Sequence, residues 1–331
     1  MIDCSFNGAE NMRIAIVGMG GVGGFFGGKL AHAFQDKPDR SVGIHFVARG
    51  PHLEMIKRQG LLLKSPDSEV LHCRPELATD RLDELPQIDV FIISVKGYDL
   101  EEVSKALSHH VSRDTVILPL LNGVDIKERM KRHIRNGVIL SACVYLSSHI
   151  ENPGVVIHTS SPRKIILGPD PDADYEPGEL LSIFREASIL HEWREDVLSA
   201  IWEKYVFIAG YGLVSARFNK TLGEIYEDRS LRDLVRKIME EIRQMAKVQK
   251  ISLPEDMVDV SLGKANLFPR DTQTSLQRDI HQGKGRSELD LFGGTIVRQG
   301  IHFNIPTPLT TQIYRELLQR AQMGKIGSLR E

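Results

Sequence analysis

A glycine-rich turn near the amino terminus constrains the fold of this 331-residue chain more than any other feature. Six consecutive residues match the pattern G-x-G-x-x-G: Gly18, Met19, Gly20, Gly21, Val22 and Gly23. The turn follows an apolar run at residues 14–17 and opens an apolar, helix-like stretch that ends near Phe34. Glycines in this position allow a tight turn, close approach of backbone N–H groups to a pyrophosphate, and close packing of helix on strand. The sequence therefore predicts a dinucleotide-binding turn between a strand and a helix.

Short apolar runs recur along the first half of the chain, separated by amphipathic stretches. They cover residues 42–48, 90–95, 115–121 and 137–146. Continuous apolar runs of this length are typical of strands that are buried on both faces, as in parallel sheets covered by helices. We therefore expect an α/β fold with an N-terminal, Rossmann-type, doubly wound parallel sheet.

The second half of the chain has a different pattern. Residues 153–169 indicate an antiparallel hairpin, and the Pro-, Gly- and Asp-rich segment after them is typical of a connector. From about Leu180 onward the apolar periodicity is helical, with no further alternation of the kind that strands show. We predict a dinucleotide-binding Rossmann-like domain over residues 12–194 and an all-helical second domain over residues 195–331. Residues 1–11 are left out of this prediction.

Charge and cysteine usage argue against several classes of partner. The chain has 42 Lys and Arg against 44 Asp and Glu, so its charge indicates neither a nucleic acid nor a membrane surface as a partner. The three cysteines, Cys4, Cys73 and Cys143, are too widely spaced to indicate a disulfide framework or a thiolate metal site. No run approaches the length of a membrane span, and the first residues lack the layout of a signal peptide. We expect a cytoplasmic protein without a bound metal.

Arg49 bears on the choice of dinucleotide. It lies in the segment HFVARG, at the position that often carries an acidic residue for the adenine ribose. An acid there would repel a 2′-phosphate, whereas an arginine can bind that phosphate through charge-assisted hydrogen bonds. The surrounding sequence GIHFVARGPH contains no acid. Arg49 could also be a solvated loop cation, but we expect the cofactor to be NADPH rather than NADH.

Two polar residues follow later strands of the predicted sheet. Lys96 precedes a helix start at which Asp99 and Glu102 have the spacing of a capping box, and Asn122 follows the next apolar run. Doubly wound folds bind ligands at the carboxyl ends of their strands. A lysine there could bring positive charge to a substrate carboxylate or a developing oxyanion, and an asparagine could hydrogen-bond the nicotinamide ribose. We assign both residues to cofactor and substrate binding, although each alone is commonly structural.

Taken jointly, several segments resemble the ketopantoate reductase (2-dehydropantoate 2-reductase) family. The resemblance rests on the glycine turn and on VARGPHLEMIKRQGL, ISVKGYDLEEV, LLNGV, IWEKYVFIAG, TSLQRDI and GRSELD, and it extends from residue 12 to about residue 323. It implies an enzyme that reduces 2-dehydropantoate to pantoate with NADPH, a step of pantothenate and coenzyme A biosynthesis. It also implies a small-molecule 2-keto acid as the partner, and it is compatible with a homodimer.

The resemblance assigns roles to three residues of the second half. It implies that Lys204 is the general acid that protonates the keto oxygen, and a partly buried ammonium has a lowered pKa that suits this task. Glu288 resembles the acidic residue that bonds the cofactor ribose or the substrate hydroxyl, and Ser275 resembles a serine that contacts the substrate. From the residues alone, these three could equally be a lysine on a helix surface, a glutamate at a helix start and a helix N-cap.

The sequence departs from the family at positions that often carry asparagine or another amide for contacts with the substrate. These positions hold Ile208, Gly212, Leu222 and Thr272. A pocket without these amides is more apolar and could accept a different branched or aromatic 2-keto acid. A third hypothesis is an NADP-binding sensor that catalyses no reaction. The joint presence of a lysine, a glutamate and a serine at the functional positions argues against a sensor.

Overall fold

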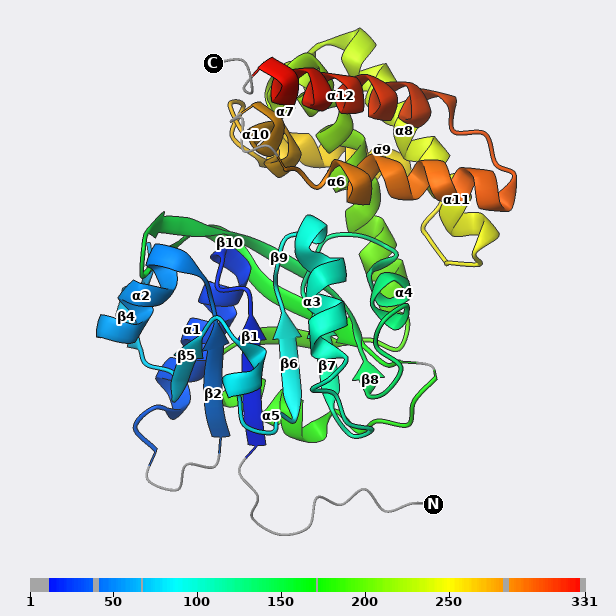
Figure 1. Ribbon diagram of the computed structural model, residues 1–331. Helices are drawn as coiled ribbons and strands as arrows, with labels where there is room; N and C mark the ends of the chain where they lie inside the picture. Colours follow the sequence, from blue (N-terminus) through cyan, green and yellow to red (C-terminus); the bar gives the residue numbers. More distant parts are fainter. Residues whose placement is uncertain (1–11, 38–41, 67, 171, 282–285, 328–331) are drawn as a thin grey trace. The chain divides into compact units, whose positions relative to one another are not determined.

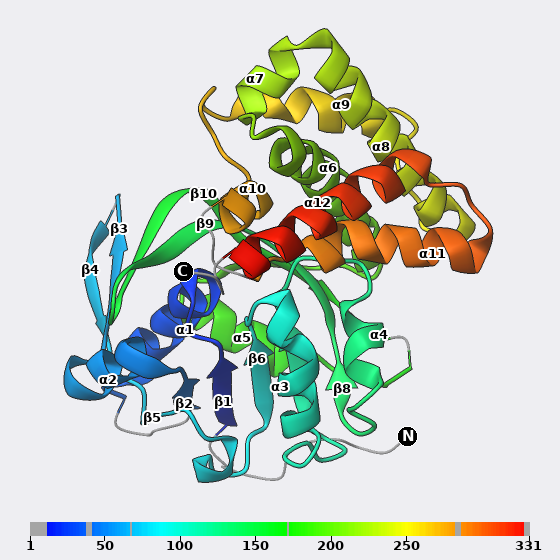
Figure 2. The same cartoon turned by 45° about the horizontal axis from the view of Figure 1, so that its top comes forward.

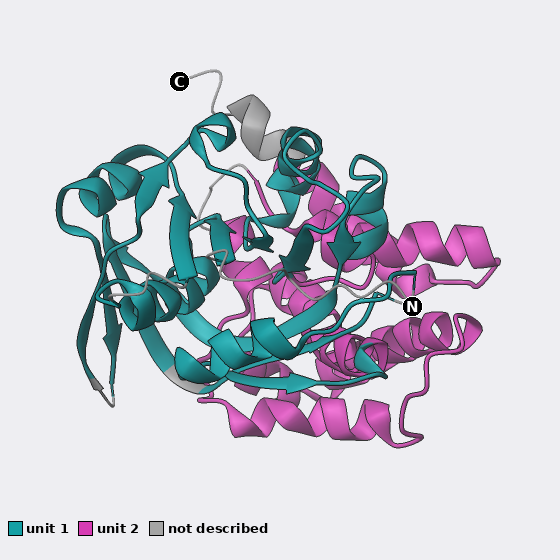
Figure 3. Ribbon diagram, turned by 90° about the horizontal axis from the view of Figure 1, so that it is seen from below, with its two compact units in different colours: residues 1–121, 126–197 teal, residues 122–125, 198–331 magenta. Residues whose placement is uncertain are grey.

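The computed structural model describes residues 12–37, 42–66, 68–170, 172–281 and 286–327, and the chain forms two compact units (Figure 3). Unit 1 comprises residues 1–121 and 126–197, and unit 2 comprises residues 122–125 and 198–331. The sequence places the change of domain between residues 194 and 195, whereas the units change between residues 197 and 198. The short segment Asn122–Asp125 groups with unit 2, which the sequence does not indicate.

A parallel sheet lies at the centre of unit 1 (Figure 1). Its six strands have the order β5-β2-β1-β6-β7-β8, and every neighbouring pair is parallel. The strands are β1 (Met12–Val17), β2 (Val42–Val47), β5 (Leu77–Thr79), β6 (Val90–Ile93), β7 (Val116–Pro119) and β8 (Val138–Ile139). All residues of β2, β6 and β7 are buried, which explains their nearly unbroken apolar runs. The predicted Rossmann-type sheet is confirmed.

Helices cover both faces of this sheet, as a doubly wound fold requires. They are α1 (Gly21–Phe34), α2 (Gly50–Gln59), α3 (Leu100–Leu107), α4 (Ile126–Lys131) and α5 (Gly178–Glu186). α1 packs beside α5, and α3 packs beside α4. In Figure 2, α3 lies in front of the sheet and α5 lies behind it. α1 begins at Gly21, within the glycine turn, and ends at Phe34, as predicted.

Unit 1 also contains a second, five-stranded sheet that the sequence does not predict. Its strands are β3 (Leu61–Ser65), β4 (Ser68–Cys73), β9 (Ser141–Asn152), β10 (Val155–Gly168) and β11 (Leu190–Trp193). They have the order β11-β10-β3-β4, with β9 paired to β10. β3 is half-buried and β4 is largely exposed. Neither strand therefore shows the long apolar run that marks the parallel strands.

Three details of the sequence prediction are wrong in this region. The run 137–146 is divided between β8 and β9, which belong to different sheets, and burial on both sides of the break hides the change. The hairpin predicted within residues 153–169 forms between β9 and β10 instead, with its turn at Pro153 and Gly154. β11 lies where only helices are expected, because its residues are exposed or half-buried and carry no strand-like alternation.

Unit 2 is built from helices, which confirms the predicted helical C-terminal domain. They are α6 (Val197–Phe218), α7 (Leu222–Glu227), α8 (Arg229–Val248), α9 (Met257–Gly263), α10 (Ser275–His281), α11 (Thr295–Phe303) and α12 (Pro308–Gly327). α11 is preceded by one turn of π-helix, Asp290–Gly294, which we call the π-turn. By length and composition α6 could cross a membrane, but 72% of its most apolar window is buried, as in a core helix.

Candidate active site

The glycine turn is held by β2 and β6, the strands on either side of β1 in the parallel sheet. Gly18 has a φ of +96°, a backbone conformation that L side chains rarely adopt. Its N–H donates to Val47 O at the end of β2 (3.0 Å), and its carbonyl accepts from Ser94 Oγ, which follows β6 (2.8 Å). The turn therefore lies at the carboxyl ends of β1, β2 and β6, where doubly wound folds bind ligands.

The other glycines of the turn fit a pyrophosphate. A Cβ atom at Gly21 would lie 2.3 Å from Ser148 O, and one at Gly23 would lie 2.1 Å from Gly18 O, so the packing excludes side chains at both positions. At Gly20, in contrast, a Cβ atom would meet nothing within 4 Å. Gly20 is the N-cap of α1, and the first turn of α1 contains no acidic residue. Open space therefore faces a helix start whose N–H groups and dipole favour an anion.

Arg49 lies at the start of α2, directly after β2, and its side chain is 66% exposed. Its Nη2 donates to Asp99 Oδ2 (2.9 Å), and the Asp99 side chain is 13% exposed. The capping box expected from Asp99 and Glu102 does not form, because Asp99 occupies the N-cap position of α3 without a side-chain capping bond. Asp99, which lies 50 residues further along the chain, is thus the acidic partner of Arg49. The sequence next to Arg49 contains no such acid.

Lys96 follows β6 by three residues and lies at the start of the short helical segment Gly97–Asp99. Its side chain is exposed, and its carbonyl accepts from Asp99 N (2.9 Å). The same turn therefore carries Lys96 at one end and the partner of Arg49 at the other.

Lys204 and Asn122 meet in unit 2. Lys204, on α6, donates from Nζ to Asn122 Oδ1 over 2.7 Å, and both side chains are half-buried. Asn122 follows β7 by three residues, and Val124 after it packs against the hydrophobic core of unit 2. The ammonium of a largely apolar helix is thus held by an amide that lies 82 residues earlier in the chain, in the loop after β7.

The face of α6 that carries Lys204 continues to Ile208 and Gly212, one and two turns further on. A Cβ atom at Gly212 would lie 3.8 Å from Leu276 Cβ, and Ser215 Oγ lies 2.6 Å from Thr274 Oγ1. The start of α10 therefore packs against this face. Ile208 and Gly212, two of the four departures noted in the sequence, therefore lie on the same face of α6 as Lys204.

Ser275 is the first residue of α10 and is half-buried. The N-cap role considered for it belongs to the preceding residue, because Thr274 Oγ1 accepts from Gln277 N (3.1 Å). The other two departures from the family pattern pair with each other, since Leu222 N donates to Thr272 O (2.9 Å). Ser275 therefore lies at the helix start that packs against α6, and the capping bond at that start does not use its hydroxyl.

Glu288 is 6% exposed and precedes the π-turn by two residues. Its carbonyl accepts from Leu291 N (3.0 Å) and Phe292 N (3.2 Å). The backbone of the π-turn therefore fixes the main chain at Glu288.

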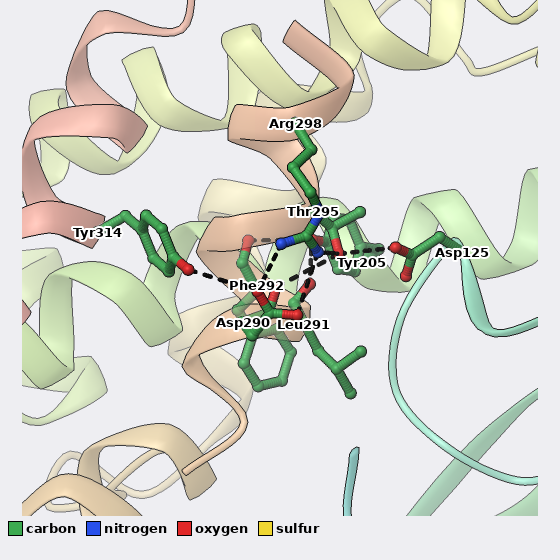
Figure 4. A network of polar contacts seen from close by, with 8 residues as sticks. All are labelled: Asp125, Tyr205, Asp290, Leu291, Phe292, Thr295, Arg298 and Tyr314. Carbon is green, nitrogen blue, oxygen red and sulfur yellow. Dashed lines mark hydrogen bonds and ion pairs between the residues drawn. The ribbon is translucent and has the colours of Figure 1, made fainter. Parts of the chain in front are cut away.

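A polar network surrounds the π-turn (Figure 4). Tyr205 OH donates to Leu291 O (2.6 Å) and Phe292 O (2.9 Å). Arg298 forms two bonds to the Asp290 carboxylate, at 2.6 and 3.1 Å. The sequence prediction did not include any of these residues. Tyr205 offered one signal, since a tyrosine within an apolar core helix requires a partner for its hydroxyl.

A further bond of this network reaches the segment of Asn122. Thr295 Oγ1 donates to Asp125 Oδ2 (3.1 Å), and Asp125 lies three residues after Asn122 (Figure 4). Thr295 is the first residue of α11 and directly follows the π-turn. The contact joins residues 170 positions apart, so spacing in the sequence could not reveal it.

Two family models match this chain. The model described as ketopantoate reductase PanE/ApbA matches residues 14–172, and its C-terminal counterpart matches residues 196–321. The chain belongs to the ketopantoate reductase family. As a member of this family it is an oxidoreductase of the class that acts on CH–OH groups.

Relatives of known sequence and structure cover nearly the whole chain. The 2-dehydropantoate 2-reductase of Nostoc sp. is 26% identical over 96% of this chain and 98% of its own length. The uncharacterized oxidoreductase YkpB of Bacillus subtilis is 25% identical over 92% and 98%. The crystal structure of a PanE/ApbA family ketopantoate reductase from Ralstonia eutropha superposes with a TM-score of 0.84 at 25% identity, covering 95% of this chain and all of the other.

Proposed function

We propose that this member of the ketopantoate reductase family reduces a 2-keto acid to the 2-hydroxy acid with NADPH, and that 2-dehydropantoate is its substrate. On this proposal the product pantoate enters the synthesis of pantothenate and coenzyme A. The observation that carries the proposal is the half-buried Lys204 ammonium, held by Asn122 Oδ1 at 2.7 Å. A binding protein without catalysis would not need a proton donor held in this way.

Residues of unit 1, together with Asn122 in the short segment that groups with unit 2, would hold the cofactor. N–H groups at the start of α1 would bind the pyrophosphate next to Gly20, where space is open. Arg49, at the carboxyl end of β2, would bind the 2′-phosphate that distinguishes NADPH from NADH. Lys96 and Asn122 each follow a parallel strand and would bind the nicotinamide ribose or the substrate carboxylate. When bound, the cofactor supplies the hydride.

Residues of unit 2 would complete the reduction. As the hydride adds to the carbonyl carbon, Lys204 Nζ donates its proton to the keto oxygen, so that the ketone becomes a secondary alcohol. The lysine then regains a proton from water. Before this transfer, the positive charge of Lys204 stabilises the developing alkoxide. Ser275 would bind the substrate carboxylate, and Glu288 would bind the cofactor ribose or the substrate hydroxyl and help to position Lys204.

The first experiment is NADPH oxidation by the purified protein with 2-dehydropantoate, followed at the nicotinamide absorbance band. NADH and a panel of other 2-keto acids serve as comparisons. Rapid turnover that requires 2-dehydropantoate and prefers NADPH is the expected result. NADPH binding without turnover of any compound in the panel would contradict the proposal and favour a sensor.

A second candidate substrate follows from one observation. On the α6 face that carries Lys204, Ile208 is half-buried, and Gly212 is buried with room for a Cβ atom in ordinary contact with Leu276. The resemblance implies that the family often carries amides at these two positions. This lining suits a bulkier branched or aromatic 2-keto acid, because an apolar group gains affinity from apolar walls. Higher kcat/KM for such an acid than for 2-dehydropantoate would favour this candidate.

Filling the space at Gly212 tests the two candidates directly. Gly212→Asn is expected to lower kcat/KM for bulky apolar 2-keto acids by roughly 10-fold relative to 2-dehydropantoate, because the added amide occupies apolar space. The new Cβ atom would lie in ordinary contact with Leu276, and thermal unfolding of the variant checks that the buried amide leaves the fold intact. Gly263→Asn is the control for a glycine-to-asparagine change in a helix of unit 2, because a Cβ atom at that position in α9 meets nothing within 4 Å. Equal changes for all substrates would contradict this role of Gly212.

Replacing Arg49 tests the choice of cofactor. Arg49→Ala is expected to weaken NADPH binding by roughly 10-fold or more and to leave NADH binding nearly unchanged, because only NADPH carries the 2′-phosphate. Binding is measured by titration of the protein fluorescence with each dinucleotide. Arg81→Ala is the matched control, because Arg81 is similarly exposed (62%) and is paired with Asp83. Equal losses for both dinucleotides would exclude Arg49 as the phosphate ligand.

A further inference from the structure

Two consecutive residues of α6 make polar contacts in different directions. The Lys204 ammonium bonds Asn122, whereas the Tyr205 hydroxyl bonds Leu291 O and Phe292 O of the π-turn. Consecutive residues on an α-helix point about 100° apart, so one short stretch of backbone serves both contacts. Tyr205 is 1% exposed and also packs edge-on against Trp202. Its hydroxyl is therefore held in the core.

The π-turn is a tightly packed structure. Thr295 N donates to Asp290 O, five residues earlier, which is the rare π-helical pattern. A Cβ atom at Gly293 would lie 2.8 Å from Tyr314 Cδ2, and one at Gly294 would lie 2.3 Å from Asp290 Oδ1, so a side chain at either position would displace a neighbouring side chain. The carbonyls that the Tyr205 hydroxyl meets belong to buried residues. Buried carbonyls need donors, so loss of the hydroxyl would weaken the π-turn itself.

The π-turn connects to the residues assigned to the reaction. Glu288 is attached through its carbonyl, which accepts from Leu291 N and Phe292 N. Asn122 is attached through Asp125, which accepts from Thr295 Oγ1. Lys204 is attached through Tyr205. Lys204 and Asn122 thus lie one and three positions from a residue that bonds the π-turn or Thr295 directly after it, and Glu288 bonds the π-turn itself.

We propose that Tyr205 is a positioning residue, whose hydroxyl couples the π-turn to α6 and thereby holds Lys204 and Glu288 in one geometry. This inference rests on the proposed reductase function. Its physical basis is the sensitivity of proton transfer to distance, since a displacement of about 1 Å can cost on the order of 100-fold in rate. Tyr205 touches neither reactant in this role and acts through its neighbour in the sequence.

The test compares two tyrosines of the same helix. Tyr205→Phe removes the hydroxyl from the π-turn. Tyr211→Phe is the matched control, because Tyr211 is also fully buried and its hydroxyl donates to Leu262 O (2.7 Å) in another part of unit 2. Both variants lose buried hydrogen bonds and should lower Tm by a similar few degrees. Tyr205→Phe alone is expected to lower kcat by about 10-fold or more, with substrate KM and NADPH affinity changed less than about twofold.

A second measurement does not depend on activity. Amide hydrogen exchange of residues 288–295 is expected to be about 5- to 10-fold faster in Tyr205→Phe than in the wild type, and unchanged in Tyr211→Phe. Unchanged exchange would overturn the coupling. Faster exchange with an unchanged kcat would overturn the positioning role. If the wild-type protein reduces no 2-keto acid, the proposed function has failed, which differs from an active wild type with equally active variants.

Thr295→Val provides an independent variant should Tyr205→Phe not fold. It removes the hydroxyl that bonds Asp125 and keeps the shape of the side chain. The expected result is a several-fold lower kcat with faster exchange of residues 288–295, because the segment of Asn122 loses one attachment. Wild-type kcat in this variant would overturn the part of the inference that concerns Asn122.

Discussion

Replacing Lys204 by alanine is expected to lower kcat by on the order of 100-fold or more, while NADPH affinity stays close to that of the wild type. The variant removes both the proton donor and the positive charge next to Asn122, and both act on the transition state for keto reduction. The glycine turn and Arg49 lie in unit 1 and are unaffected by the change. Steady-state kinetics at saturating NADPH, with a separate binding titration, give the two quantities.

Two further variants separate the roles of Lys204. Lys204→Arg keeps the charge, but a guanidinium does not give up its proton near neutral pH, so little activity should return. Lys237→Ala is the control, because Lys237 lies on α8, is 60% exposed and is paired with Asp233. Turnover of Lys204→Ala within about threefold of the wild type would remove Lys204 from its proposed role.

Alanine at two positions of the glycine turn is expected to give opposite results. Gly20→Ala should leave stability unchanged, because its Cβ atom meets no protein atom within 4 Å, and should weaken NADPH binding by about 10-fold or more. Gly23→Ala should lower the free energy of unfolding by about 3 kcal/mol, because its Cβ atom would lie 2.1 Å from a backbone oxygen. Thermal unfolding without ligand and dinucleotide titration measure the two effects.

The comparison between the two glycines supplies its own control. Loss of stability in Gly20→Ala would show that the space beside the turn is filled by protein, and unchanged NADPH affinity would show that the dinucleotide binds elsewhere. Gly178→Ala is a further reference for a glycine of unit 1 with open space, at the start of α5.

The parallel strands could be predicted from the sequence because their burial produces unbroken apolar runs. β2, β6 and β7 are buried along their whole length, so their sequences stand out against the amphipathic helices between them. The change of sheet at Ser141 was not predictable, because residues on both sides of it are buried alike. β11 pairs with the four residues 164–167 of β10 and is exposed or half-buried. Its sequence therefore resembles the helical segments around it.

The candidate site was predictable to the extent that it follows local motifs. The glycine turn is a local motif, because all of its glycines lie within six consecutive residues. Lys204 stands out as a charged residue within an apolar helical run. Both can therefore be recognised from the sequence alone. The partner of Arg49 and the donors at the π-turn are different in kind. Arg49 and Asp99 are 50 residues apart, and Tyr205 and Leu291 are 86 apart. Such contacts depend on tertiary packing, which spacing in the sequence does not encode.

The grouping of Asn122–Asp125 with unit 2 has a consequence for modularity. The chain passes from one unit to the other three times, after residues 121, 125 and 197. A fragment that starts at Leu198 would therefore carry Lys204 and Thr295 but would lack the Asn122 amide and the Asp125 carboxylate that bond them. The helical half alone therefore does not contain all the residues that hold its candidate site. Exchange between relatives by recombination would need to carry the loop after β7 together with everything from α6 onward.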